Sequence, residues 1–370
     1  MSKFSKVTAL LLVMIMVLVA FAACGSSDQA ASPGSDEGKQ AKDIKDIIVG
    51  VSVGTTTEER WQREIDMFKQ YASDNGFNLI VQSAENNAQK QVSQCENLLN
   101  QGIDVLILQS LDADAVAPII DEAHDAGVPV ISYDRFAMNC DLDYYVSFDS
   151  FKVGVLQATF VTQKAPKGNY IWLKGGEEDN NAHLVADGQK SVLQPLIDKG
   201  DIKVVLEQWC KGWDPNEALK NTENGLTLAN NDIQGVVASN DGTAGGAIQA
   251  LAAQGLKVPI SGQDADIAAC QRIVEGTQTG TVYKPLAKLN LAACELAVAL
   301  ATGKDPKTSI DSDLGTWTAL NNNQKDVDTF SVDVMAIDQS NLYDIIIKQD
   351  KFHTLDEVYK NVPKDQWPQE

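Results

Sequence analysis

The stretch IDVLILQSLDADAVAPIIDEAHDAGVPVISYDR, residues 103–135, has a counterpart further along the chain in IQGVVASNDGTAGGAIQALAAQGLKVPISGQDAD, residues 233–266. Each stretch opens with an apolar run, passes through a polar turn into a helical segment, and then reaches a glycine. A second apolar run with a proline near its start follows, and an aspartate comes soon after it. The shared order predicts one topology used twice, although the two stretches differ too much to form a tandem repeat array.

The same alternation of short apolar runs and helical segments extends outward from both stretches. In residues 59–75, Trp61, Ile65 and Phe68 recur at helical spacing, and a glycine closes the segment. Runs of valine and isoleucine between such helices indicate a parallel sheet covered on both faces, so we predict an α/β protein with two similar doubly wound parallel-sheet lobes. The predicted strands are 47–53, 78–82, 104–108, 128–133, 169–173, 203–208, 235–239, 258–262 and 280–283, and the predicted helices are 59–75, 89–100, 113–126, 182–196 and 217–228.

The first 45 residues predict export and attachment to a membrane. Two lysines precede an apolar run at 7–19, which is too short to span a bilayer comfortably and has the order of a secretory signal. The run ends in FAACG, residues 21–25, where small residues before Cys24 resemble the lipobox of bacterial lipoproteins. We therefore expect a signal peptide at 1–23, a lipid on Cys24 and a flexible tether over 24–45. Ordinary signal cleavage beside an incidental cysteine is the alternative.

Composition excludes several classes of partner. The chain carries 30 Lys and Arg against 51 Asp and Glu, a net charge of −21, which would repel nucleic acid. The cysteines beyond Cys24 show neither a CxxC pair nor a histidine at metal-ligand spacing, so we predict no metal site and no cofactor. One or two disulfides remain open for a protein outside the cell, without a pairing that the sequence identifies among Cys95, Cys140, Cys210, Cys270 and Cys294.

Polar and aromatic side chains follow nearly every predicted strand. In an open α/β sheet, ligands bind beyond the carboxyl ends of the strands, so these side chains are candidate ligand contacts. One aspartate at such a place is usually only a helix N-cap, but clusters after seven strands favour a site shared by both lobes. The candidates include Arg60, Trp61, Asp134, Arg135, Asp179, Asn181, Trp209, Asn240, Asp264 and Lys284, whereas core packing is the favoured interpretation for Trp213.

This mixture of side chains suits a sugar. Carboxylates accept hydrogen bonds from hydroxyl groups, arginine and lysine donate to them, and asparagine does both. The C–H face of a pyranose packs well against an indole, which is an apolar plate with a polar edge. The candidate residues therefore favour a monosaccharide as the ligand.

Several motifs resemble the type I periplasmic binding proteins, and within that family the D-xylose-binding group that serves ABC importers. The resemblance spans residues 46–355 and implies the two-lobed fold of that family, which is not enzymatic. Its motifs include ERWQREIDMF (59–68), YDR (133–135), DNNA (179–182), QWCKGWDP (208–215), SGQDAD (261–266) and GTQTGTVYKP (276–285).

The resemblance assigns the sugar contacts to the same ten residues. They are Arg60, Trp61, Asp134, Arg135, Asp179, Asn181, Trp209, Asn240, Asp264 and Lys284. Two departures flank this set: TTTE at 55–58 replaces a pattern that more usually holds another basic residue, and GGEED at 175–179 stands where Ser-Pro is common. The exact sugar therefore stays open between xylose, glucose, arabinose and others.

The resemblance also implies three crossings between the lobes. The expected N-terminal lobe is 46–153 with 286–321, the C-terminal lobe is 154–285 with 322–350, and 351–370 is a C-terminal tail. We expect a monomeric, extracytoplasmic, lipid-anchored protein that closes its hinge on a monosaccharide, D-xylose by resemblance, and delivers it to the permease of an ABC importer.

An enzyme and a repressor fit this sequence less well. A glycosidase needs a pair of carboxyl groups, but carboxylates near Arg135 and Lys284 stay ionised and serve better as acceptors than as acids. No nucleophile or metalloprotease motif is present. A repressor of this fold would need a DNA-binding motif where this chain has a signal sequence. A sensor that presents the sugar to a chemoreceptor or sensor kinase, and a broader pentose and hexose binder, remain open.

Overall fold

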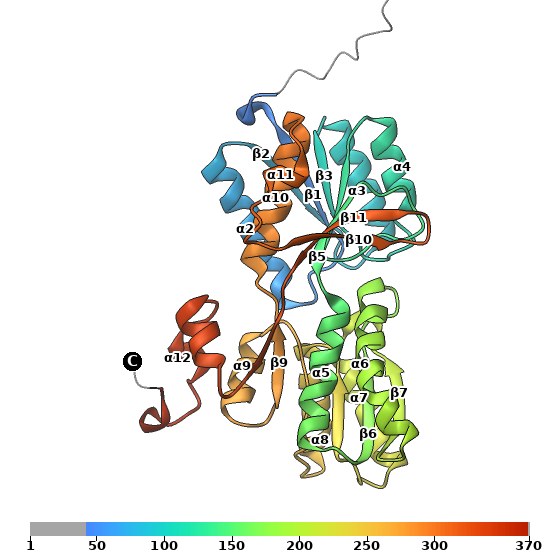
Figure 1. Ribbon diagram of the computed structural model, residues 1–370, viewed down its shortest axis with the longest axis vertical. Helices are drawn as coiled ribbons and strands as arrows, with labels where there is room; N and C mark the ends of the chain where they lie inside the picture. Colours follow the sequence, from blue (N-terminus) through green and yellow to red (C-terminus); the bar gives the residue numbers. More distant parts are fainter. Residues whose placement is uncertain (1–41, 369–370) are drawn as a thin grey trace, which may run out of the picture. The chain divides into compact units, whose positions relative to one another are not determined.

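Two parallel sheets organise the described part of the chain, residues 42–368 of the computed structural model (Figure 1). These residues belong to one compact unit. The expected signal peptide, Cys24 and nearly all of the expected tether lie outside the described residues. Within 42–368, no helix combines the length and the apolar character that a membrane crossing needs.

The first lobe is built on a seven-stranded sheet in the order β10-β11-β5-β4-β3-β1-β2. All neighbouring strands run parallel except β10, which is antiparallel to β11. Helices α2 (Glu59–Asn75) and α10 (Leu286–Thr302) cover one face, and α3 (Ala88–Asn100) and α4 (Ala117–Asp125) cover the other. The short η1 (Ile44–Asp46) precedes the sheet and α11 (Pro306–Ser309) follows α10; the strands are β1 (Ile48–Val53), β2 (Asn78–Ser83), β3 (Val105–Gln109), β4 (Val130–Tyr133), β5 (Tyr144–Phe148), β10 (Thr316–Asn321) and β11 (Asp326–Val332).

The residue pattern of β3 explains why helices cover both faces of this sheet. Val105 and Ile107 lie in the core formed with α2 and α10, whereas Leu106 and Leu108 lie in the core formed with α3 and α4. Successive strand side chains point to opposite faces, so a strand that is covered on both sides has to be apolar throughout. The predicted doubly covered parallel sheet is therefore confirmed.

The second lobe contains a three-stranded parallel sheet in the order β7-β6-β8. Helices α5 (Ser150–Lys164) and α6 (Asn180–Asp198) pack on one face, and α7 (Pro215–Leu228) and α8 (Asp241–Ala253) pack on the other. A separate antiparallel pair, β9 with β12, lies beside α9. The bounds are β6 (Gly168–Lys174), β7 (Ile202–Trp209), β8 (Gly235–Ala238), β9 (Gly280–Tyr283), β12 (Met335–Asp338), η2 (Lys211–Trp213) and α9 (Ile267–Val274).

The predicted strand at 258–262 is wrong. Ile260 makes only a single bridge, to Val236 in β8. The backbone N–H of Ile260 donates to the hydroxyl of Thr279, and that of Ala238 donates to the hydroxyl of Ser261. Side-chain hydroxyls thus occupy the positions that a strand ladder would give to neighbouring backbone carbonyls.

The structure differs from the expected lobe boundaries in two places. β11 pairs with β5, and its residues Phe330 and Val332 lie in the core of the first lobe. Residues 326–332 therefore belong to the first lobe, although the expected boundary assigned 322–350 to the second. Because α5 packs on α6 from its first turns, the first crossing lies at Asp149 rather than after residue 153.

The segment after β12 packs on the second lobe. It contains η3 (Tyr343–Gln349), α12 (Leu355–Val358) and η4 (Lys364–Gln366). Val358 and Tyr359 are buried in one cluster with residues of α9. His353 Nε2 lies 2.8 Å from the carbonyl oxygen of Ala265. Within the expected C-terminal tail, 351–370, residues 353–359 are therefore packed on the second lobe.

Helices α5 and α6 cross at two glycines. A Cβ atom on Gly154 would overlap the carbonyl oxygen of Val185, and one on Gly188 would overlap that of Phe151. The two helix backbones therefore touch directly, which is possible only where both side chains are absent. This contact ties α5, the first helix after the first crossing, to the helix that carries Asn181 in its first turn.

The cysteines of the described residues are all free and buried: Cys95, Cys140, Cys210, Cys270 and Cys294. Burial raises the pKa of the Cys95 and Cys140 thiols to about 11. These thiols therefore stay protonated at neutral pH, and residues 42–368 contain none of the disulfides that the sequence left open.

Candidate functional site

The two lobes enclose a pocket at the carboxyl ends of their strands. The space within its lining that no atom fills, open solvent included, is about 430 Å³. Nine of the ten predicted contact residues line it: Arg60, Trp61, Asp134, Arg135, Asp179, Asn181, Asn240, Asp264 and Lys284. The lining also contains residues outside the predicted set, namely Glu58, Ser147, Phe148, Ser150, Val153, Val185, Trp213 and Gln263.

Arg60 lies close to three carboxylates in and beside the pocket. It lies in the first turn of α2 and is 4% exposed. Its Nη2 lies 2.8 Å from Asp134 Oδ2, its Nη1 lies 3.7 Å from Asp264 Oδ1, and its Nε lies 2.6 Å from Glu64 Oε1. Lys284 Nζ adds a second cation 2.9 Å from Asp264 Oδ1. Because Asp134 follows β4 of the first lobe and Asp264 belongs to the second, Arg60 links the two lobes through the pocket.

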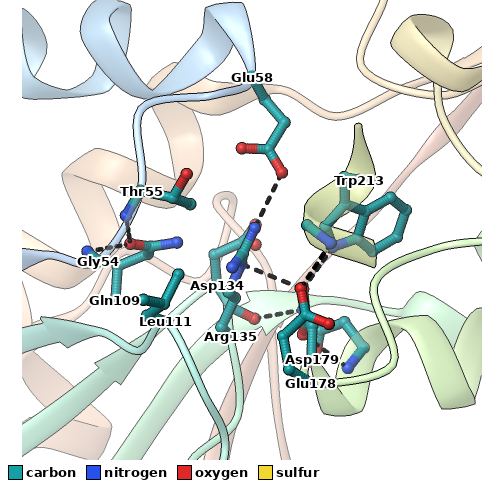
Figure 2. Close-up of polar contacts among 12 residues, drawn as sticks. Gly54, Thr55, Glu58, Gln109, Leu111, Asp134, Arg135, Glu178, Asp179 and Trp213 are labelled. Atoms are coloured by element: carbon teal, nitrogen blue, oxygen red, sulfur yellow. Dashed lines mark hydrogen bonds and ion pairs between the residues drawn. The ribbon is translucent and has the colours of Figure 1, made fainter. Parts of the chain in front are cut away.

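Arg135 forms a second link between the lobes (Figure 2). Its Nη2 lies 2.9 Å from Glu58 Oε1 of the first lobe, and its Nε lies 3.1 Å from Asp179 Oδ2 of the second. Asp179 is the N-cap of α6, where its Oδ1 accepts from the backbone of Asn181. The other carboxylate oxygen also accepts from Trp213 Nε1 at 3.2 Å.

Asn181 reaches across the pocket from the second lobe. Its Nδ2 donates to the backbone carbonyl of Asp134 at 2.6 Å, and its Oδ1 accepts from the hydroxyl of Tyr145 at 3.0 Å. Ala113 N also donates to the carbonyl of Glu178 at 3.1 Å. These hydrogen bonds join the lobes in a closed arrangement, because each connects a residue of the first lobe with a residue of the second.

The buried charges set the protonation of the pocket carboxyls. Burial alone would raise the pKa of Asp134, but Arg60, Lys284 and Arg135 outweigh it, and the pKa falls below its usual value. Burial raises the pKa of Asp179 in spite of Arg135. Asp134 is therefore an ionised acceptor at neutral pH and not a proton donor.

Asp134 and Asp264 occupy equivalent places in the two lobes. Both have a left-handed backbone, with φ of 60° and 93°. The N–H of Asp134 donates to Val146 O of β5 at 2.8 Å, and that of Asp264 donates to Val282 O of β9 at 2.9 Å. The matching sequence stretches thus place the first aspartate after their second apolar run in the same way. Such unfavourable backbone conformations in residues other than glycine tend to occur at functional sites.

Trp209 does not line the pocket, and Trp213 does. Trp209 lies at the end of β7, with Lys174 Nζ 4.1 Å from its ring centroid and the His183 ring at 4.7 Å. Gly212 and Trp213 both have left-handed backbones, with φ of 62° and 58°, so the chain turns before Trp213. The Trp213 ring lies flush against the backbone of Gly175, where a Cβ atom would overlap it. The glycines of KGW (211–213) and LKGG (173–176) are the features of the sequence that could have indicated this placement.

Two buried polar atoms of the pocket have ion-pair partners but no well-aligned hydrogen bond within the described residues: Arg60 Nη2 and Asp264 Oδ1. A sugar hydroxyl is both a donor and an acceptor, so it suits either atom. The described residues contain no group of three or more His, Cys, Asp or Glu side chains arranged to hold a metal ion. The pocket therefore has the chemistry of a polyol site.

The chain is similar to known periplasmic binding proteins over most of its length. The periplasmic binding protein domain family matches residues 49–305. The D-xylose-binding periplasmic protein of Escherichia coli (strain K12) is 45% identical over 320 residues, which are 86% of this chain and 94% of that protein. The corresponding protein of Haemophilus influenzae is 47% identical over 317 residues, which are 85% of this chain and 93% of that protein.

Solved structures show the same similarity. The solute-binding protein of an ABC transporter from Clostridium phytofermentans, with bound β-D-glucose, has a TM-score of 0.77 and 26% identity, covering 84% of this chain and 99% of that one. A carbohydrate transporter solute-binding protein from Chloroflexus aurantiacus, in complex with D-glucose, has a TM-score of 0.76 and 31% identity, covering 82% and 96%.

Proposed function

This chain belongs to the periplasmic binding protein family, as an extracytoplasmic monosaccharide-binding member and not an enzyme, and we propose that it captures D-xylose by closing two lobes and delivers the sugar to an ABC importer. The observation that carries the proposal is the pocket in which Arg60 and Arg135 each contact carboxylates of both lobes. A ligand that exchanges hydrogen bonds with these groups stabilises the closed state over an open one. The permease of the importer distinguishes that state from the empty protein.

Xylose is the proposed sugar because the curated relatives that bind D-xylose match most of this chain. The pocket walls include two indoles, Trp61 and Trp213, in a small enclosed space. Xylose lacks the exocyclic CH2OH group of glucose, so a hexose has to displace a wall or strain the site. Overpacking of this kind costs roughly 1–3 kcal/mol.

We expect xylose to bind about 10-fold or more tightly than glucose, which corresponds to roughly 1.4 kcal/mol. Calorimetric titration with xylose, glucose, arabinose and ribose measures this directly. Small-angle scattering of the same samples should give a smaller radius of gyration with xylose than without. Glucose binding as tight as xylose would remove the pentose assignment, and an unchanged scattering profile at saturation would remove the closure mechanism.

We also propose that the protein is a monomer held at the membrane by a lipid on Cys24. The support is the sequence before it, in which an apolar run ends in small residues next to this cysteine. A Cys24→Ser variant should then appear in the soluble fraction, because nothing replaces the lipid. Fractionation after a high-salt wash tests this, with Ser27→Ala as the control that stays with the membrane. Retention of Cys24→Ser in the washed membranes would contradict the lipid anchor.

A further inference from the structure

Glu58 lies in the pocket without an assigned role. It is the last residue of TTTE, the segment before ERW that departs from the usual pattern of the family. Glu58 occupies the N-cap position of α2, yet its side chain makes no capping hydrogen bond to that helix. An N-cap side chain ordinarily accepts from the first free N–H groups of its helix. The carboxylate of Glu58 is therefore directed to other partners.

Those partners are two groups of the sugar pocket. Glu58 Oε2 accepts from Trp61 Nε1 at 2.6 Å, and Glu58 Oε1 lies 2.9 Å from Arg135 Nη2. The Glu58 side chain is only 9% exposed. Each carboxylate oxygen thus holds one pocket group, the indole by its polar edge and the guanidinium by one nitrogen.

The arrangement has a counterpart in the second lobe (Figure 2). Asp179 Oδ2 pairs with Arg135 Nε at 3.1 Å and accepts from Trp213 Nε1 at 3.2 Å. One guanidinium is therefore held between two carboxylates, and each carboxylate also holds the indole of a tryptophan. The chain Trp61–Glu58–Arg135–Asp179–Trp213 runs from one aromatic wall of the pocket to the other, and Glu58 supplies its first-lobe half.

We propose that Glu58 is a specificity-determining positioning residue, which fixes the indole of Trp61 and the guanidinium of Arg135 and so sets the space between the two aromatic walls. This inference rests on the proposed sugar-binding function. Without the carboxylate, the Trp61 indole loses the hydrogen bond at its polar edge and is held by core packing and by Arg60, 4.4 Å from its ring centroid. Arg135 then keeps Asp179 as its ion-pair partner. If the Trp61 wall can shift, a larger sugar fits into the pocket with a smaller loss of binding free energy.

Two substitutions separate the contacts of Glu58. Glu58→Gln keeps an acceptor oxygen for Trp61 Nε1 but places a neutral amide against Arg135. Glu58→Leu removes both contacts. We expect Glu58→Leu to bind xylose about 10-fold more weakly, because charged hydrogen bonds are lost, and to lower the xylose-to-glucose affinity ratio at least 3-fold. Glu58→Gln should lose about 3-fold in affinity and keep the wild-type ratio, because Trp61 remains held.

Glu59→Gln is the matched control, with the same change of charge one residue further along. The Glu59 side chain is 48% exposed, and its ion pair, with Arg63, spans 3.9 Å. We expect its xylose affinity and its sugar ratio to equal those of the wild type. A role in folding alone would lower the thermal midpoint of the Glu58 variants and leave the sugar ratio unchanged.

The experiment is calorimetric titration of the four proteins with xylose and with glucose. A wild-type affinity and ratio in both Glu58 variants would overturn the inference, and so would an affinity loss in Glu58→Leu with an unchanged ratio. If Glu58→Leu does not fold, Glu58→Ala, which also removes both contacts, takes its place with the same expected fall in the xylose-to-glucose ratio. A wild-type protein that binds no sugar would instead overturn the proposed function, so the two failures are distinct.

Discussion

Replacing Arg60 with methionine should abolish measurable sugar binding and lower the free energy of unfolding by about 3–5 kcal/mol. The guanidinium has Asp134, Asp264 and Glu64 as partners, and it is 4% exposed. Methionine fills much of the volume of the arginine side chain. It carries no charge, so the buried carboxylates lose the cation that offset their desolvation. Removing one member of a buried ion network costs this much because the remaining charges keep their desolvation penalty.

Urea unfolding measures the stability loss, and calorimetry with xylose measures the binding loss. Without Arg60, burial should raise the pKa of Asp134 and Glu64, since a nearby cation no longer favours their ionised forms. As the pH falls, these carboxylates take up protons, and the desolvation penalty of their charged forms disappears. The loss in the free energy of unfolding should therefore be smaller at pH 5 than at pH 8.

Arg63→Met is the matched control on the same helix. Arg63 donates to the carbonyl of Phe352 and is 29% exposed, so its loss should cost only about 1 kcal/mol. An Arg60→Met protein that binds xylose within 10-fold of wild type and unfolds at the same urea concentration would show that the guanidinium is dispensable.

Trp213→Ala should weaken xylose binding about 30-fold, or roughly 2 kcal/mol, whereas Trp209→Ala should change it less than about 2-fold. Trp213 lines the pocket and donates to Asp179, so its truncation removes both an aromatic wall and a partner of the carboxylate. Trp209 contacts Lys174 and His183 outside the pocket. The two substitutions are identical and four residues apart, so each controls for the other. Titration of both variants with xylose tests which substitution weakens binding more. A larger loss in Trp209→Ala would show that Trp209, and not Trp213, contacts the sugar.

Local signals were sufficient for much of the fold. The helix 59–75 is predicted with the bounds that the structure gives, because its apolar spacing and the left-handed Gly76 that ends it are both readable within one segment. The resemblance implies the other lobe for residues 326–332, whereas their pairing as β11 with β5 joins residues more than 180 positions apart. No local feature of residues 326–332 indicates which sheet this strand joins.

In the candidate site too, the residues marked by local sequence signals are predicted, and those placed by distant contacts are not. Residues directly after strands, such as Asp134 and Asp264, line the pocket because topology alone brings strand ends together. Trp213 was passed over because its placement depends on a tight left-handed turn at Gly212. Glu58 was passed over because a polar residue before a helix predicts an N-cap, and only the folded chain brings Arg135 beside it.

The glycine crossing of α5 and α6 bears on the mechanics of the protein. Helices whose backbones touch at Gly154 and Gly188 have no intervening side chains that could rearrange, so they move together as a stiff lever. If the lobes close as proposed, bending is expected in the short connections, at Asp149, at Lys284 and Pro285, and at Asp333 and Val334. Lys284 is also a pocket residue, so one of these pivots carries a side chain that pairs with Asp264. Under the proposed closure, a sugar that binds beside Lys284 acts directly on one of these connections.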